Sequence, residues 1–181
     1  PGGDAANRDP WRNALARLDA SGLSPLADTL FAEKPRVALR HAVAERVNAP
    51  LSSSAGRLFD AMAAVLGYDG PQSHEGEAAM GLEALASEAP LDEALQPYPF
   101  GIPAATGVLD DTPLWEDVAR DLQDGIAPEV MALRFHAGVA HAFALQARRL
   151  VEDGRARAVV LSGGCFQNAV LLELTLRALR R

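Results

Sequence analysis

The segment VVLSGGCFQN, residues 159–168, has the residue types and spacing that best suit ligand chemistry. Gly163 and Gly164 follow a β-branched run and precede an apolar, helix-like stretch. Glycines at such a turn let a ligand approach the backbone, and the N-terminus of a following helix offers N–H groups to an anion. This geometry suits a nucleotide phosphate, and Asn168 could bind a ligand hydroxyl or local backbone. A purely structural Gly-Gly turn is the alternative.

A second segment, SSSAGRLFDAMAAVLG, places two opposite charges on one predicted helix. Arg57 and Asp60 are three positions apart, so they share a helix face and can form an ion pair. Asp60 is therefore either a surface or capping carboxylate or an acceptor for a ligand.

A third segment, SHEGEAAMGLEALA, has carboxylates on both sides of Gly76. Glu75 and Glu77 lie where a polar loop leads into a predicted helix. Acidic side chains stabilise the start of a helix without any ligand, so structural and functional interpretations of Glu75 and Gly76 both remain open.

The histidines and the cysteine carry weaker signals. His136 and His141 are five apart and point about 140° from each other around a helix, so they are not the pair that a metal ion requires. His41 stands alone on an alanine-rich stretch. Cys165 has no base beside it in the sequence and no second cysteine to pair with. We expect packing or surface roles for all four and no metal site.

The rest of the sequence predicts the elements that position these residues. Helical spacing, capping residues and Pro or Gly breaks predict helices over residues 11–21, 24–32, 35–47, 57–66, 75–86, 113–125 and 128–152, and from 166 onward. Residues 1–9 are expected to be turn-rich, and residues 90–113 irregular or strand-like. The β-branched run 156–161 predicts a buried strand. The predicted class is a helix-dominated α/β fold.

Composition narrows the class of protein. The chain has 181 residues, 49% of them hydrophobic, and a net charge of −7, which argues against nucleic acid as a main partner. No apolar run approaches the roughly 20 residues of a membrane span, and the first residues lack the pattern of a signal peptide. A single cysteine suits a reducing compartment. We expect a cytoplasmic protein with no membrane partner.

The ends of the chain predict a fragment. Pro1 is not an initiator methionine, and Arg181 ends a predicted helix without a stop signal. We expect a piece of a longer polypeptide that is inactive alone. Apolar faces left by missing neighbours would favour self-association, for example a homodimer.

Five segments in this order resemble one family, the HypF carbamoyltransferases of NiFe-hydrogenase maturation. They are PGGDAANRDPWR, SSSAGRLFDAMAAVLG, SHEGEAAMGLEALA, RFHAGVAHAF and VVLSGGCFQNAVLLE, and they cover essentially the whole chain. The resemblance implies that residues 1–181 are part of a C-terminal carbamoyltransferase domain, without a second domain. It also implies a partial actin/Hsp70-like (ASKHA, RNase H-like) ATPase fold.

The resemblance also implies a reaction and its participants. In that family carbamoyl phosphate and ATP give a carbamoyl-adenylate, and the carbamoyl group passes to the C-terminal cysteine of the acceptor protein HypE for cyanide-ligand synthesis. ATP is therefore the expected cofactor, and carbamoyl phosphate and a HypE-type protein are the expected partners. No catalytic residue is assigned by the resemblance.

Several residues match positions of the family's motifs. Gly163, Gly164 and Asn168 match its GG-x-x-x-N nucleotide motif. Asp60 matches an aspartate that approaches the ribose hydroxyls in related ATPases. Gly76 matches the glycine of the EGQAA loop, and Glu75 precedes it at the expected edge of the site.

Departures from the family pattern leave alternatives open. The H-x-x-x-H pair and the later Asp that hold metal in the family are absent, so the ligands of a divalent metal accompanying ATP are expected outside this chain. His74 replaces a usual Tyr and Cys165 a usual Val. The alternatives are an O-carbamoyltransferase of small metabolites and a noncatalytic helical interaction module.

Overall fold

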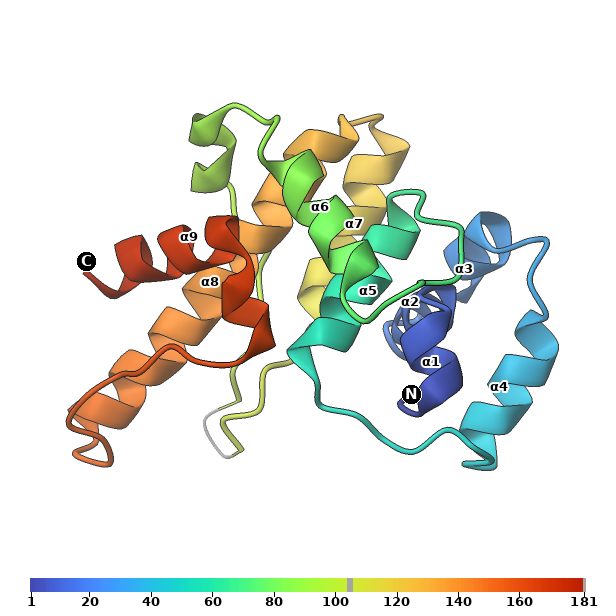
Figure 1. Cartoon of the computed structure of the whole chain (residues 1–181), viewed down its shortest axis with the longest axis horizontal. Coiled ribbons are helices and arrows are strands. Elements are labelled where there is room, and N and C mark those ends of the chain that lie inside the picture. Colours follow the sequence, from blue (N-terminus) through green and yellow to red (C-terminus); the bar gives the residue numbers. More distant parts are fainter. Residues whose placement is uncertain (104–105, 181) are drawn as a thin grey trace. The chain divides into compact units, whose positions relative to one another are not determined.

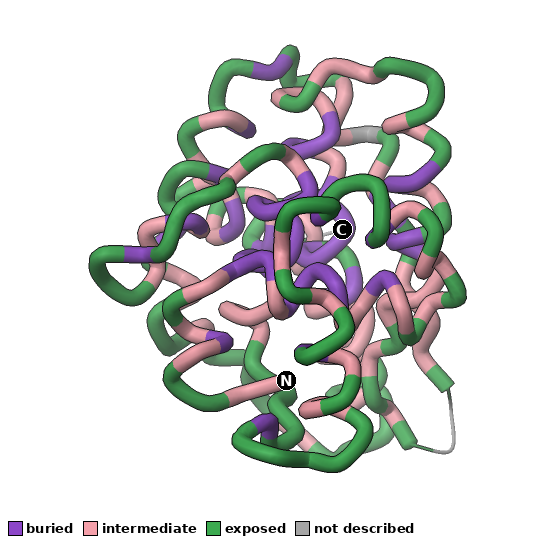
Figure 2. The backbone as a smooth tube through the Cα atoms, turned by 90° about the vertical axis from the view of Figure 1, so that its right-hand side faces the viewer, coloured by how far each residue is buried: buried purple, intermediate pink, exposed green. Residues whose placement is uncertain are grey.

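Amphipathic helices build both compact units of the chain, which are Pro1–Leu82 and Glu83–Arg181. A computed structural model describes residues 1–103 and 106–180. Figure 1 shows these helices and the loops that join them. Most buried positions lie on the helices, whereas the connecting loops are largely exposed (Figure 2).

The first unit is arranged around its second helix. Its elements are α1 (Asp4–Arg8), α2 (Trp11–Ala20), α3 (Ser24–Leu30), α4 (Arg36–Ala44), α5 (Ala55–Val65) and the first residues of α6 (Glu77–Ala86). Helix α2 packs against α5 and also contacts α1, α3 and α4. Leu15 and Leu18 of α2 are fully buried, as is Met62 of α5, because apolar residues at helical spacing form one face.

The second unit is arranged around a long helix. Its elements are 3-10 helix η1 (Leu91–Leu95), α7 (Thr112–Gln123), α8 (Pro128–Glu152), 3-10 helix η2 (Gly164–Gln167) and α9 (Ala169–Leu179). Helix α8 contacts α7, η1 and α9, and α9 lies across it in Figure 1. Within the described residues, no helix has both the length and the apolar character needed to cross a membrane.

A polar cluster fixes the segment after η1 to α8. The hydroxyl of Tyr98 donates to Asp121 over 2.7 Å, and Arg134 donates to the same carboxylate over 3.0 Å. Arg134 also donates to Glu93 over 2.7 Å, and its carbonyl accepts from the backbone N–H of Tyr98. The absence of a Cβ at Gly138, one turn along α8, lets the Tyr98 backbone approach the helix.

The predicted strand over residues 156–161 is wrong. This run forms no strand, and the exposed fraction of Val160 is 82%. A buried strand needs a second strand for its backbone groups and side chains to cover it. Among the described residues there is no named strand, only an isolated bridge between Gly101 and Asp110. The described fold is therefore helix-dominated without the predicted strand.

Two helix starts also differ from the sequence prediction. Residues 1–9 contain α1 rather than only turns, and the helix expected from residue 166 begins at Ala169, after η2. Asn168 has an extended backbone and caps α9, which sets the later start. The other predicted helices are confirmed, with ends that differ by a few residues. The irregular stretch 90–113 contains η1 and the bridge, and residues 104–105 lie outside the described part.

Candidate functional site

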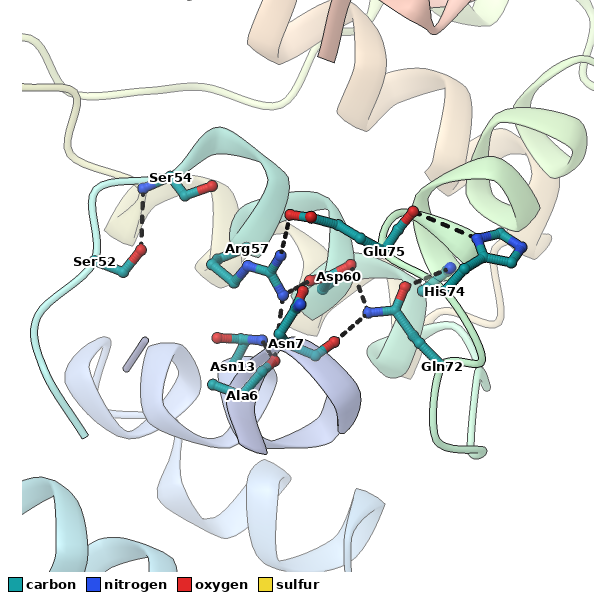
Figure 3. A network of polar contacts seen from close by, with 11 residues as sticks. Ala6, Asn7, Asn13, Ser52, Ser54, Arg57, Asp60, Gln72, His74 and Glu75 are labelled. Carbon is teal, nitrogen blue, oxygen red and sulfur yellow. Dashed lines mark hydrogen bonds and ion pairs between the residues drawn. The ribbon is translucent and has the colours of Figure 1, made fainter. Parts of the chain in front are cut away.

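In the first unit, the predicted Arg57–Asp60 pair is formed in the interior of the protein (Figure 3). Nη1 of Arg57 lies 2.7 Å from Oδ2 of Asp60, in an ion pair that lacks hydrogen-bond geometry. The Arg57 guanidinium also donates to the carbonyl of Ala6 over 3.4 Å and to Glu75 over 3.3 Å. One cation thus connects α5 with α1 and with the loop before α6.

Gln72 is the residue of this network that sequence reasoning missed. Its amide nitrogen donates to the carbonyl of Asn7 over 2.7 Å and to Oδ1 of Asp60 over 3.3 Å, while its oxygen accepts from Ala78 N over 3.0 Å. Its backbone N–H donates to the carbonyl of Arg8. A glutamine in a loop carries no sequence pattern that marks it, because all of its partners are set by tertiary packing.

Burial raises the pKa of Asp60 to about 6. Desolvation of the carboxylate is the largest cause, and it outweighs the opposing effects of Arg57 and the Gln72 hydrogen bond. The Asp60 residue is only 2% exposed. Its carboxyl group therefore changes charge closer to neutral pH than an ordinary aspartate.

Because its pKa is raised, the Asp60 carboxyl group destabilises the folded protein when it ionises. The variant Asp60→Asn cannot ionise and should lack this loss of stability. Between pH 4.5 and 7 the unfolded chain loses the Asp60 proton before the folded protein does, so the wild type loses stability as pH rises. Relative to Asp60→Asn, its free energy of unfolding should fall by about 2 kcal/mol over this range. Urea unfolding of both proteins at several pH values measures the difference. Parallel pH profiles would contradict a raised pKa.

Glu75 and Gly76 lie in the loop that leads into α6. The Glu75 side chain is 77% exposed and reaches Arg57 at the edge of the network. Gly76 has a φ of 87°, a conformation that favours glycine, and its carbonyl accepts from the N–H of Met80. A pocket of about 510 Å³ opens beside this loop. It is lined by Asp4, Ala5, Asn7, Arg8, Gln72, Ser73, His74 and Glu75.

In the second unit, the Gly163–Gly164 turn is exposed and unobstructed. Gly163 has a φ of 95°, and a Cβ added at either glycine would meet no atom of the described part of the chain within 4 Å, adjacent residues aside. The turn follows the run 156–161, whose residues 157–160 are exposed, and opens η2. A ligand can therefore approach this backbone closely, as the sequence predicts.

Asn168 is a helix cap in this structure. Its side-chain oxygen accepts from the N–H of Leu171 over 2.7 Å, while its side-chain nitrogen lies 3.0 Å from Nε2 of His136. Glu83 accepts from the N–H of Ala169 over 2.6 Å. Two of the first N–H groups of α9 therefore already have protein acceptors, so an anion at the turn would have to bind other N–H groups. A ligand role for Asn168 stays a prediction.

The structure thus gathers the predicted site residues in two places. Asp60, Glu75 and Gly76 belong to the network and loop of the first unit, and Gly163, Gly164 and Asn168 follow one another in the second. Within the described residues, no three His, Cys, Asp or Glu side chains are grouped in a way that could hold a metal ion. What the arrangement offers is an open backbone turn and a buried, charged network.

Comparison with known proteins identifies a matching family and similar proteins. The family model described as "Carbamoyltransferase, Kae1-like Domain, second subdomain" matches residues 1–181. The chain is 52% identical to the carbamoyltransferase HypF of Rhodobacter capsulatus over 175 residues, which are 96% of this chain and 22% of that protein. The chain therefore spans about a fifth of the length of this relative.

Solved structures agree with this match. The chain superposes on a crystal structure of full-length HypF in the phosphate- and nucleotide-bound form with a TM-score of 0.85 and 27% identity, covering 97% of this chain and 28% of that one. The crystal structure of T. kodakarensis HypF gives a TM-score of 0.79 and 26% identity, covering 99% of this chain and 25% of that one.

Proposed function

The chain belongs to the HypF carbamoyltransferase family, and from this premise we propose that it supplies part of the nucleotide-binding site of such an enzyme. The proposed complete protein uses carbamoyl phosphate and ATP to carbamoylate the C-terminal cysteine of a HypE-type acceptor. Because this chain covers about a fifth of a relative, we assign it one part of the site rather than the whole activity.

The observation that carries the proposal is the open Gly163–Gly164 turn. Among the described residues, no atom beyond the adjacent residues lies within 4 Å of a Cβ placed at either glycine, so a phosphate or a nucleobase can reach the backbone there. The related solved HypF structure is described as phosphate- and nucleotide-bound, which supports a nucleotide as the ligand.

The exposed run before the turn supports an ATPase-like fold for the complete protein. Val159 and Val160 are β-formers with exposed fractions of 41% and 82%. We propose that residues 156–161 become a strand in an actin/Hsp70-like sheet when other parts of the complete protein supply its neighbours. The turn would then lie at the end of that strand, where such folds bind ligands.

Asp60 fits a direct nucleotide contact less closely than the turn does. Its residue is 2% exposed, and its two oxygens face Arg57 and Gln72. A hydrogen bond from a ribose hydroxyl to this carboxylate requires one of those two side chains to move. We therefore propose the turn as the primary nucleotide contact of this chain and the ribose role of Asp60 as a second one.

The proposed transfer step needs no nucleophile from this chain. The sulfur of the acceptor cysteine attacks the carbonyl carbon of carbamoyl-adenylate, the bond from that carbon to the phosphate oxygen breaks, AMP leaves and the thiol proton passes to solvent. The protein must hold the adenylate and stabilise the charge that develops on the oxygens, which backbone N–H groups of a glycine turn are suited to do.

The variant Gly164→Val tests the proposed nucleotide contact. Gly164 has open space and no positive φ, so valine fits the fold but covers the backbone that a ligand would approach. In the complete protein we expect the dissociation constant for ATP, measured by calorimetry, to rise by at least about tenfold. Gly70→Val is the matched control, because this loop glycine is equally open.

The control should bind ATP as the wild type does, and both variants should keep the wild-type melting temperature. Equal ATP affinity in Gly164→Val and the wild type would contradict the proposed contact. The absence of ATP binding by the complete wild-type protein would overturn the nucleotide function itself.

A further inference from the structure

A buried histidine lies directly behind the cap of α9. His136, in the middle of α8, has no exposed surface. Its Nδ1 lies 2.7 Å from the carbonyl oxygen of Ala132, one turn earlier, and its Nε2 lies 3.0 Å from the side-chain nitrogen of Asn168. Both ring nitrogens thus face defined partners from two helices.

These partners determine the protonation of the ring. The Ala132 carbonyl can only accept, so the proton lies on Nδ1, and Nε2 of the neutral ring must accept from the Asn168 amide. Burial lowers the pKa of His136 to about 4, so the ring is neutral under ordinary conditions.

The histidine in turn fixes which way the Asn168 amide points. Because Nε2 needs a donor, the NH2 group of Asn168 faces α8, and its oxygen faces the N–H of Leu171 that it caps. Leu171 and Thr175 of α9 are also fully buried, and Thr175 donates to the Leu171 carbonyl. The cap is therefore held from the side of α8 as well as within α9.

The Gly163–Gly164 turn ends at this cap. Only the four residues of η2, Gly164–Gln167, separate Gly163 from Asn168, and the N–H of Asn168 donates to the carbonyl of Cys165. A rotation of the Asn168 side chain would release the first turn of α9 and, with it, the anchored end of the glycine turn.

We propose that His136 is a positioning residue for the nucleotide-binding turn, acting through its hydrogen bond to Asn168 rather than by touching the ligand. This inference rests on the proposed function, in which the turn binds ATP. It gives a role to His136, the first of the two histidines of the RFHAGVAHAF segment, for which the sequence predicts a packing or surface role.

The test compares two substitutions of His136 in the complete protein. Leucine fills the space but accepts no hydrogen bond, and we expect it to raise the dissociation constant for ATP by about tenfold. Glutamine has an oxygen that can accept from Asn168, and it should restore affinity to within about threefold of the wild type. His141→Leu, a change at an exposed histidine of the same helix, is the control and should bind normally.

A double-mutant cycle separates positioning from general packing. If His136 acts through Asn168, the protein with both His136→Leu and Asn168→Ala should bind ATP as weakly as Asn168→Ala alone. Additive losses, or equal losses in the leucine and glutamine variants, would overturn the proposal.

A substitution of Asn168, the hydrogen-bond partner of His136, keeps the test valid if His136→Leu does not fold. Asn168→Asp keeps an acceptor for Leu171 but cannot donate to His136, so it should also weaken ATP binding, and unchanged affinity would overturn the inference.

Failure of the inference is distinguishable from failure of the proposed function. If Gly164→Val loses ATP affinity while the His136 and Asn168 variants do not, the turn binds the nucleotide without this histidine.

Discussion

Replacing Gly138 by alanine is expected to lower the free energy of unfolding by about 3 kcal/mol or more. A Cβ at this position would overlap the carbonyl oxygen of Tyr98 and press on the neighbouring backbone carbon and nitrogen. Backbone cannot move aside as a flexible side chain can. Relief would therefore break the bond from the Tyr98 N–H to the Arg134 carbonyl and loosen the bond from its hydroxyl to Asp121.

The matched control is Gly81→Ala. Gly81 also lies inside a helix, α6, but an added Cβ there meets no described atom within 4 Å apart from its own helix backbone. Alanine at this site should stabilise the protein by up to about 1 kcal/mol, because it lowers the entropy cost of forming the helix. Urea unfolding followed by circular dichroism measures both changes. Similar stability of the two variants would show that the Tyr98 backbone is not held against α8.

Replacing Arg57 by alanine is expected to destabilise the protein by about 4 kcal/mol at pH 8. Asp60, with a pKa of about 6, is ionised at that pH, and the variant leaves its buried carboxylate without a cation. At pH 5 the carboxyl group is largely neutral, so the loss should be smaller. Arg120→Ala removes a pair of the same i,i+3 spacing in which the arginine side chain is 67% exposed, and should cost less than about 1 kcal/mol.

A second substitution identifies the origin of the loss. Asparagine at position 60 keeps the shape of Asp60 and an acceptor for Gln72, but carries no charge. The double variant Arg57→Ala with Asp60→Asn should therefore recover most of the stability at pH 8. Equal instability of the single and double variants would mean that lost contacts of Arg57, such as its bond to the Ala6 carbonyl, dominate.

The pair of positions in α8 shows how one helix carries two different constraints. Gly138 admits the Tyr98 backbone, and His136, two residues earlier, receives the Asn168 amide. Neither constraint can be read from the RFHAGVAHAF segment, because both partners lie more than thirty residues away in the chain. Their effects can still be separated. Gly138→Ala should mainly lower the free energy of unfolding, whereas His136→Leu should mainly weaken nucleotide binding.

The sequence by itself determined most of the helices, the motifs and the family. Helix α2 and helix α8 follow from apolar residues at helical spacing with proline at their start, and these signals act within a few residues of one another. The five ordered motifs predict the HypF family, and the family match over residues 1–181 confirms it. The Arg57–Asp60 pair was also predictable, since three positions along a helix place two side chains together.

Features that depend on residues far apart in the sequence were decided by the tertiary structure alone. It left residues 156–161 without a strand and residues 157–160 exposed, because a strand forms only with a partner strand, and β-branched residues do not by themselves supply one. It buried Asp60 and gave Gln72 its partners, and it turned Asn168 into a cap supported by His136. Each of these outcomes depends on desolvation and on hydrogen bonds between residues distant in sequence, which local residue patterns do not encode.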